Sequence, residues 1–157
     1  MDNQFKKAVD KTLQHEGGYV DDPHDPGGET NFGISKRSYP DLDIENLTRD
    51  EAEEIYFKDF WQKNNYGGIK NHKIAEKVFD LSVNMGARRA NCLLQIAVNY
   101  AGTPVIVDCV IGPQTLSAVN GQTPEYLLAL LQVEAVRYYV SRENARYEKG
   151  WVKRAVS

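Results

Sequence analysis

The stretch HEGGYVDDPHDPGGETNFGIS, residues 15–35, decides how the rest of this 157-residue chain is interpreted. A helical pattern enters it from the N-terminus, ends at Gly17-Gly18, and gives way to acidic residues, prolines and further glycines. Glu16 therefore stands at a helix C-terminus, where the negative end of the helix dipole should raise the pKa of its carboxyl group. A carboxyl group that keeps its proton near neutral pH suits general acid catalysis; the alternative is a solvated side chain at a fraying helix end.

A second carboxylate follows at a useful distance in the sequence. Asp25 lies nine residues after Glu16, and a strand-turn-strand pattern would fold it back toward the helix end. A protonated carboxyl group facing an ionised one is the arrangement that cleaves glycosidic bonds. Asp22 competes with Asp25 for this role, its other role being to cap the turn before Pro23. Thr30 either holds a water or the second carboxylate through its hydroxyl, or is an ordinary strand threonine.

Apolar periodicity predicts a mostly helical chain with one small β excursion at residues 18–35. Two very short strands are expected there, one at Tyr19-Val20 and one through Thr30, Phe32 and Ile34, around a turn with Pro26-Gly27-Gly28. The expected helices cover residues 3–16, residues from the Thr48–Glu51 capping box to near 64–65, residues 72–85, residues from about 90 to 102, a short segment from Pro113, and a long segment from Thr123 to Gly150.

Composition narrows the class of protein. Hydrophobic residues make up 41% and charged residues 26% of the chain, as in an ordinary globular domain or two small lobes that share a core. The sequence contains no apolar run of the roughly 18 to 20 residues that a membrane span needs, and its charged N-terminus lacks a signal-peptide core. Nucleic acid is not an expected partner, because no basic run carries interleaved aromatic residues.

Two cysteines do not make a disulfide framework. Cys92 and Cys109 are expected to be small buried or half-buried residues, with a disulfide between them as the alternative. The acidic loop does not follow the EF-hand pattern, and the three histidines lack zinc-ligand spacing. We therefore expect no metal ion and no cofactor.

Several other side chains are candidates for binding a ligand. Tyr19 either lies over a sugar ring or anchors the hairpin to the core. Trp61 and Tyr66 could line a saccharide groove, although aromatic residues at helical spacing usually belong to the core. Arg88 and Arg89 follow Gly86 closely; they are interpreted as solvated residues at a helix start, with contact to peptide-stem carboxylates as the alternative.

These residues form a longer pattern that resembles a known family. The spacing Glu-x8-Asp-x4-Thr is one residue shorter than the Glu-x8-Asp-x5-Thr pattern of phage-type lysozymes. The fuller pattern is similar to glycoside hydrolase family 108, the N-acetylmuramidases of phage endolysins and related bacterial proteins. It consists of Glu16-Gly17-Gly18-Tyr19, Asp22-Pro23, Asp25-Pro26-Gly27-Gly28, Thr30, Gly33-Ile34-Ser35, Asn84-Met85-Gly86 and Gly150-Trp151-Val152-Lys153-Arg154. The segment 108–115 resembles the Asp-Gly-x-x-Gly-Pro-x-Thr element of the family's predicted peptidoglycan-binding region, with Cys109 in place of glycine, where a left-handed backbone is less comfortable.

The resemblance implies a mainly α, lysozyme-like fold with a small β-hairpin after the first helix. It implies a glycoside hydrolase part at residues 1–86 and a helical, predicted peptidoglycan-binding part at residues 87–157, packed on the same core. Glu16 would be the general acid of an N-acetylmuramidase that cleaves the β-1,4 bond between N-acetylmuramic acid and N-acetylglucosamine. Two alternatives stay open: a lytic transglycosylase that needs Glu16 alone, and a non-catalytic wall-binding protein.

The resemblance also implies how the protein works in the cell. Its partner would be the glycan strands of peptidoglycan, and we expect a monomer. The chain would be made in the cytoplasm and act on the cell wall or periplasm after release, or after export aided by a holin or a secretion partner.

Overall fold

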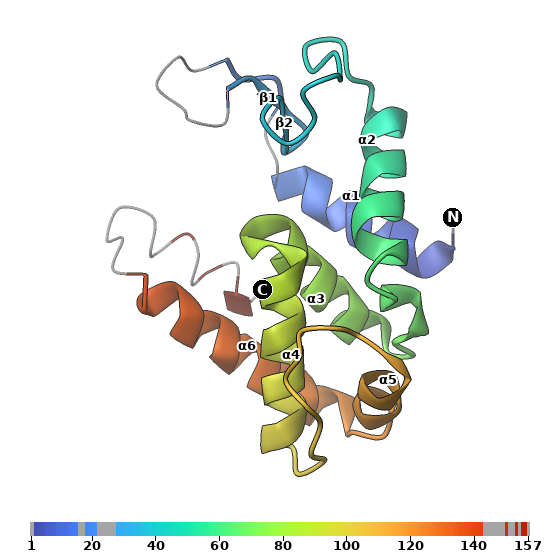
Figure 1. The fold of residues 1–157 in the computed structure, drawn as a ribbon, viewed down its shortest axis with the longest axis vertical. Coiled ribbons are helices and arrows are strands. Elements are labelled where there is room, and N and C mark those ends of the chain that lie inside the picture. The colour runs from blue at the N-terminus through green and yellow to red at the C-terminus, as the bar shows by residue number, and fades with distance from the viewer. Residues whose placement is uncertain are drawn as a thin grey trace.

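A computed structural model describes residues 2–15, 18–21, 28–142, 150, 153 and 155–156, with side chains at 14 and 15 left out. The chain is mainly α with one small antiparallel sheet, which confirms the predicted fold class (Figure 1). Its helices are α1 (Asn3–His15), α2 (Arg49–Ile55), α3 (His72–Met85), α4 (Ala87–Tyr100), α5 (Pro113–Asn120) and α6 (Pro124–Val140); the strands are β1 (Thr30–Asn31) and β2 (Ile34–Ser35). Among the described residues, no helix is long and apolar enough to cross a membrane.

Helix α1 forms where the sequence predicts it. The carboxylate of Asp2 accepts a hydrogen bond from the backbone N–H of Phe5 at 2.6 Å and so caps the helix start. Phe5, Val9 and Leu13 lie on one buried face, as their spacing predicts. Helix α1 is therefore packed against the core as far as Leu13.

Helix α3 is the centre of the molecule. It packs against α1 on one side and against α4 and α6 on the other (Figure 1). The side chain of Asn71 caps its start by accepting from the backbone N–H groups of Lys73 and Ile74, and Gly86, with φ of 90°, separates it from α4. The buried apolar residues form one cluster that runs from Phe5 to Ala155.

The segment after α2 differs from its prediction. The predicted capping box is confirmed: Thr48 and Glu51 exchange side-chain and backbone hydrogen bonds at the start of α2. The predicted single helix, however, changes at Tyr56 to a π-helix, Tyr56–Gln62, followed by a short 3₁₀ turn, Tyr66–Gly68. The π-helix packs Phe57 and Trp61 edge-on against Phe5 of α1, with ring centroids 4.9 and 5.5 Å from that of Phe5.

The hairpin also differs from its prediction. Residues 30–34 were expected to form one strand, but Thr30 pairs with Ser35 and Asn31 with Ile34. A two-residue turn separates the strands, with φ of 51° at Phe32 and 77° at Gly33. Two positive φ angles in succession give the tight turn that joins antiparallel strands, and Gly33 is the local signal for it. In place of the strand predicted at Tyr19-Val20, the structure has a single antiparallel bridge between Val20 and Thr30.

Cys92 is buried and Cys109 half-buried, as expected, and the two form a disulfide, which confirms the alternative that the sequence left open. The side chains of Asn91 and Gln95 in α4 bind the backbone of Cys109 and bring its Cα within 4.3 Å of that of Cys92. Cys109 has φ of 66°, the left-handed backbone expected where the related element has glycine. The predicted C-terminal helix is described as α6 to Val140; residues 143–149 lie outside the described residues.

Candidate active site

The candidate site lies where α1 ends and the hairpin begins. Helix α1 ends at His15, so Glu16 is the next residue in the chain. Val20 and Thr30 exchange two backbone hydrogen bonds of 2.8 Å, which hold together the two ends of the segment that carries Asp22 and Asp25. Glu16, Asp22 and Asp25 themselves lie outside the described residues, and their roles stay predictions.

Thr30 is the predicted catalytic residue that the structure describes. It is half-buried in β1, and its hydroxyl donates a hydrogen bond to the carbonyl oxygen of Gly28 at 3.4 Å. Its backbone pairs with Val20 on one side and with Ser35 on the other. Thr30 therefore has a structural task in the hairpin, and a catalytic role for its hydroxyl stays a prediction.

Tyr19 stands on the surface beside the hairpin. Its side chain is 42% exposed, and its phenol donates a hydrogen bond to Glu29 Oε2 at 3.1 Å. Partial desolvation and this hydrogen bond raise the pKa of Tyr19. The second oxygen of Glu29 lies 3.8 Å from the ammonium group of Lys36. Because Tyr19 does not belong to the hydrophobic core, the interpretation that it anchors the hairpin to the core is wrong, and its ring is open to a ligand.

Trp61 and Tyr66 do not line a groove, so this part of the predicted site is wrong. Trp61 is 2% and Tyr66 is 0% exposed, and their ring centroids lie 6.1 Å apart in the core. The phenol of Tyr66 donates to Asn91 Oδ1 at 2.7 Å. The π-helix and the turn after it direct both rings inward, against Phe79 in the case of Trp61, so neither ring can stack on a sugar.

A groove of about 440 Å³ runs beside the hairpin, and no sequence pattern indicated it. Its walls come from Gly33 and β2, from the segment after β2, from the π-helix and from Val83 near the end of α3. In it the phenol of Tyr39 donates to Asp59 Oδ2 at 2.7 Å. Burial and this hydrogen bond raise the pKa of Tyr39, so it stays a neutral donor. Phe60 adds an aromatic ring to the same lining.

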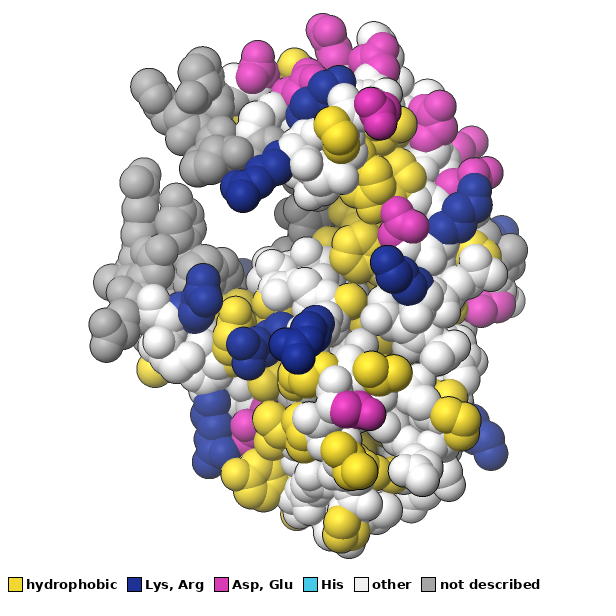
Figure 2. Space-filling view, in the orientation of Figure 1, with side chains coloured by type: hydrophobic (Ala, Val, Ile, Leu, Met, Phe, Trp, Pro, Cys, Tyr) yellow, Lys and Arg dark blue, Asp and Glu magenta, His cyan; other side chains and the backbone are white. Residues whose placement is uncertain are grey.

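This groove has the composition that a saccharide needs. Hydroxyl, carboxylate and aromatic groups lie together in it, and its volume falls within the range of about 300–1,000 Å³ that ligand sites occupy. The sequence could not predict it, because Tyr39 and Asp59 are twenty residues apart and belong to no motif. Figure 2 shows hydrophobic side chains in the middle of this face and acidic side chains gathered along its upper and right edges.

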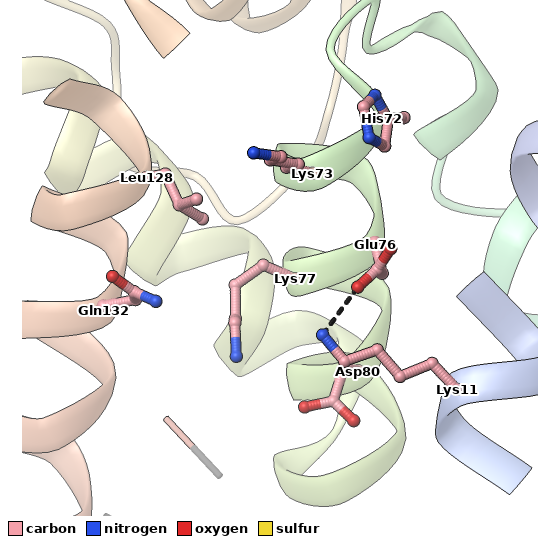
Figure 3. A pocket seen from close by; sticks show the side chains of 8 residues that line it. All are labelled: Lys11, His72, Lys73, Glu76, Lys77, Asp80, Leu128 and Gln132. Carbon is pink, nitrogen blue, oxygen red and sulfur yellow. Dashed lines mark hydrogen bonds and ion pairs between the residues drawn. The ribbon is translucent and has the colours of Figure 1, made fainter. Parts of the chain in front are cut away.

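A second cavity, of about 340 Å³, lies between α1, α3 and α6 and has a different character. Figure 3 shows Lys77 and Asp80 on α3 and Gln132 on α6 lining it, with an ion pair of 2.7 Å between Lys11 and Glu76. None of the described residues in its lining is a Phe, Tyr or Trp, and it shares no residue with the groove at the hairpin. Of these two cavities, only the groove at the hairpin offers aromatic rings on which a sugar could stack.

No metal site is found among the residues that the structure describes, where no three His, Cys, Asp or Glu side chains come together. Asp22, His24 and Asp25 lie outside that part of the chain.

Comparison with known families assigns both halves of the chain. Residues 9–86 match the model of the family described as glycosyl hydrolase 108, and residues 89–156 match the one described as a predicted peptidoglycan domain. The chain belongs to the glycosyl hydrolase 108 family. This glycosyl hydrolase 108 protein thus carries a glycoside hydrolase domain together with a peptidoglycan domain, which makes it a lysozyme-like protein directed at peptidoglycan.

One solved structure supports the fold over nearly the whole length of this family member. SagA from Brucella abortus is similar with a TM-score of 0.79 and 28% sequence identity, over 96% of this chain and 88% of that chain. Among the curated proteins, none matches the chain in sequence.

Proposed function

We propose that this glycosyl hydrolase 108 protein is an N-acetylmuramidase that hydrolyses the β-1,4 bond between N-acetylmuramic acid and N-acetylglucosamine. The observation that carries the proposal is that the family match spans the end of α1, where Glu16 follows a helix packed against α3. The dipole of a helix favours the protonated form of a carboxyl group that follows its C-terminus in the chain.

Glu16 would act as the general acid. It would give its proton to the glycosidic oxygen of the leaving N-acetylglucosamine while the bond from that oxygen to C1 of N-acetylmuramic acid breaks. The hydroxyl of a water molecule would then add to C1, and the remaining proton of the water would return to a carboxylate. Asp25, or Asp22 in its place, would either attack C1 directly or activate that water, and the Thr30 hydroxyl would help to position it.

The groove beside the hairpin supports the proposal as the place for the glycan strand. Tyr39 and Asp59 offer polar groups for sugar hydroxyls, and Phe60 offers an aromatic ring. Tyr19 presents a further exposed ring at the start of the hairpin segment.

The place of action would be the cell wall or periplasm, because that is where peptidoglycan lies. We propose that the protein is made in the cytoplasm and reaches the wall after release, or with a holin or a secretion partner, and that it acts as a monomer.

Mass spectrometry of the soluble products released from purified peptidoglycan tests this function. Wild type is expected to release muropeptides with reducing ends, whereas Glu16→Gln and Asp25→Asn are expected to fold and release none. Asp21→Asn is the matched control, because Asp21 is an exposed carboxylate of the same segment, and it should keep wild-type release.

Other products would overturn the proposal in recognisable ways. Products with 1,6-anhydro ends from wild type and from Asp25→Asn would make the protein a lytic transglycosylase. No release by well-folded wild type from several wall types would leave a wall-binding protein. An active Asp25→Asn with an inactive Asp22→Asn would move the second carboxylate to Asp22.

A further inference from the structure

Two arginines share one tyrosine ring on the side of the molecule formed by α4 and α6. The guanidinium carbon of Arg89, in the first turn of α4, lies 5.0 Å from the ring centroid of Tyr138 near the end of α6. The guanidinium carbon of Arg142, two residues after α6, lies 5.8 Å from the same centroid. Cation–π attraction therefore places two exposed guanidinium groups around one ring.

Neither guanidinium binds a carboxylate among the residues that the structure describes. Arg137, five residues before Arg142, shows the contrast, because it binds Glu134 Oε1 at 2.7 Å. A positive charge without a carboxylate partner attracts an anion, and each of these two charges adds to that attraction. A guanidinium group offers several N–H donors in a plane that matches a carboxylate.

A hollow of about 250 Å³ lies beside this arginine pair. Its lining includes Asn84, Met85 and Tyr139 in addition to Tyr138 and Arg142. Asn84 Oδ1 accepts a hydrogen bond from the Tyr139 phenol at 2.6 Å, which fixes the amide and leaves its N–H₂ group to donate elsewhere. The hollow therefore presents donors from an amide and from a guanidinium, a set that suits a ligand rich in carbonyl and carboxylate oxygens.

The hollow and the groove at the hairpin both lie near the end of α3. Val83 lines the groove, whereas Asn84 and Met85, the next two residues of α3, line the hollow. Successive residues of a helix are offset by about 100° around its axis, so the two cavities lie on different sides of this helix end. A branched ligand that passes the end of α3 would place its main chain in the groove and its branch over the arginine pair. Figure 2 shows Lys and Arg side chains across the middle of this face, below the acidic region.

We propose that Arg89, Arg142 and Asn84 bind the carboxylate and carbonyl groups of the stem peptide of peptidoglycan. This inference rests on the proposed function, which places the glycan strand in the groove at the hairpin. The stem peptide branches from N-acetylmuramic acid and carries free carboxylates. The guanidinium groups bind these carboxylates, Tyr138 keeps both guanidinium groups in place, and Asn84 donates to a peptide carbonyl. The site spans both family matches, since Asn84 lies in the first and the two arginines lie in the second.

Isothermal titration calorimetry with two soluble fragments tests the inference. One fragment is the disaccharide N-acetylglucosaminyl-N-acetylmuramic acid with its stem peptide, and the other is the same disaccharide without the peptide. Neither contains the bond that the proposed muramidase cleaves, so wild-type protein is used. The peptide is expected to tighten binding by about tenfold or more, and Arg89→Gln/Arg142→Gln is expected to remove this gain.

Matched variants separate the arginine pair from positive charge in general. Arg88→Gln removes a neighbouring exposed arginine that has no aromatic or ionic contact among the described residues, and it should keep the full gain. Arg89→Lys/Arg142→Lys keeps the charge but loses the planar donors, and it should keep part of the gain. Unchanged unfolding midpoints of these variants show that the fold is intact.

The outcomes distinguish this inference from the proposed function. If the peptide adds no affinity, or if the gain survives in Arg89→Gln/Arg142→Gln, the inference is wrong even where reducing ends are released from peptidoglycan. If the gain is present and depends on the arginine pair but no bond is cleaved, the stem-peptide site stands and the muramidase proposal falls.

Discussion

At the scale of single residues, Gln95 organises the loop that follows α4. Its two amide N–H groups are shared among three acceptors: Asp108 Oδ1 at 2.8 Å, the carbonyl of Val110 at 3.0 Å and Thr115 Oγ1 at 3.1 Å from the amide nitrogen. Its amide oxygen accepts from the backbone N–H of Cys109 at 2.7 Å. The side chain is 1% exposed, so water could hardly reach its partners and take over these hydrogen bonds if the side chain were removed.

Replacing Gln95 should therefore lower the free energy of unfolding more than replacing a glutamine that makes a single hydrogen bond at the surface. Gln95→Ala leaves several polar groups without a partner, and we expect the free energy of unfolding to fall by about 2–3 kcal/mol. Gln122→Ala is the control, because the amide of Gln122 makes one exposed hydrogen bond, to Thr103, and it should cost under about 0.5 kcal/mol. Urea unfolding measures both, and equal losses would contradict the role given to Gln95.

At the scale of elements, the start of α2 couples the fold to pH. The carboxylate of Glu51 accepts hydrogen bonds from the backbone N–H of Thr48 at 2.9 Å and from its hydroxyl at 2.7 Å. Both hydrogen bonds lower the pKa of Glu51 below its ordinary value, and the bond from the Thr48 backbone has the larger effect. A group with a lowered pKa stabilises the folded state above the pKa of the unfolded chain and loses this contribution as pH falls through its folded value.

The free energy of unfolding should thus decrease as pH falls below about 5. Glu51→Gln keeps an oxygen acceptor for Thr48 but cannot titrate, so its stability should depend less steeply on pH in this range. Urea unfolding of both proteins at several pH values between about 5 and 3 measures the two slopes. Identical slopes would show that the capping carboxylate does not contribute to the acid sensitivity.

How far each element could be predicted from sequence depends on whether its cause is local. The capping box of α2 is fixed by Thr48 and Glu51, three residues apart, and the sequence predicts it correctly. The π-helix is not predictable in this way, because it serves the packing of Trp61 against Phe5, from distant parts of the chain. The same holds for the candidate site. A local motif singles out Glu16, so the sequence predicts that residue. The groove depends on tertiary contacts made by the segment after β2, so the sequence does not predict it.

At the scale of the whole molecule, the two family segments share one core. Helix α3 belongs to the first segment and packs against α1 of the same segment, but also against α4 and α6 of the second. The junction is polar as well as apolar: Asn65 donates to the carbonyl of Ile111 at 2.9 Å, and Asn91 binds both Tyr66 and Asn64. The groove and the arginine pair, on either side of the end of α3, therefore depend on the same packing.

Because the core is shared, we expect the chain to unfold in a single cooperative transition. Differential scanning calorimetry of the full chain is expected to show one transition whose calorimetric and van't Hoff enthalpies agree, near 110 kcal/mol at about 0.7 kcal/mol per residue. The fragment 1–86 should not fold alone, because it would expose the apolar side of α3 that packs against α4 and α6. Two resolved transitions, or a fragment 1–86 with a cooperative melt and native near-ultraviolet circular dichroism, would instead make the two segments independent domains. In that case the stem-peptide site, which takes Asn84 from one segment and its arginines from the other, would depend on how the two domains dock.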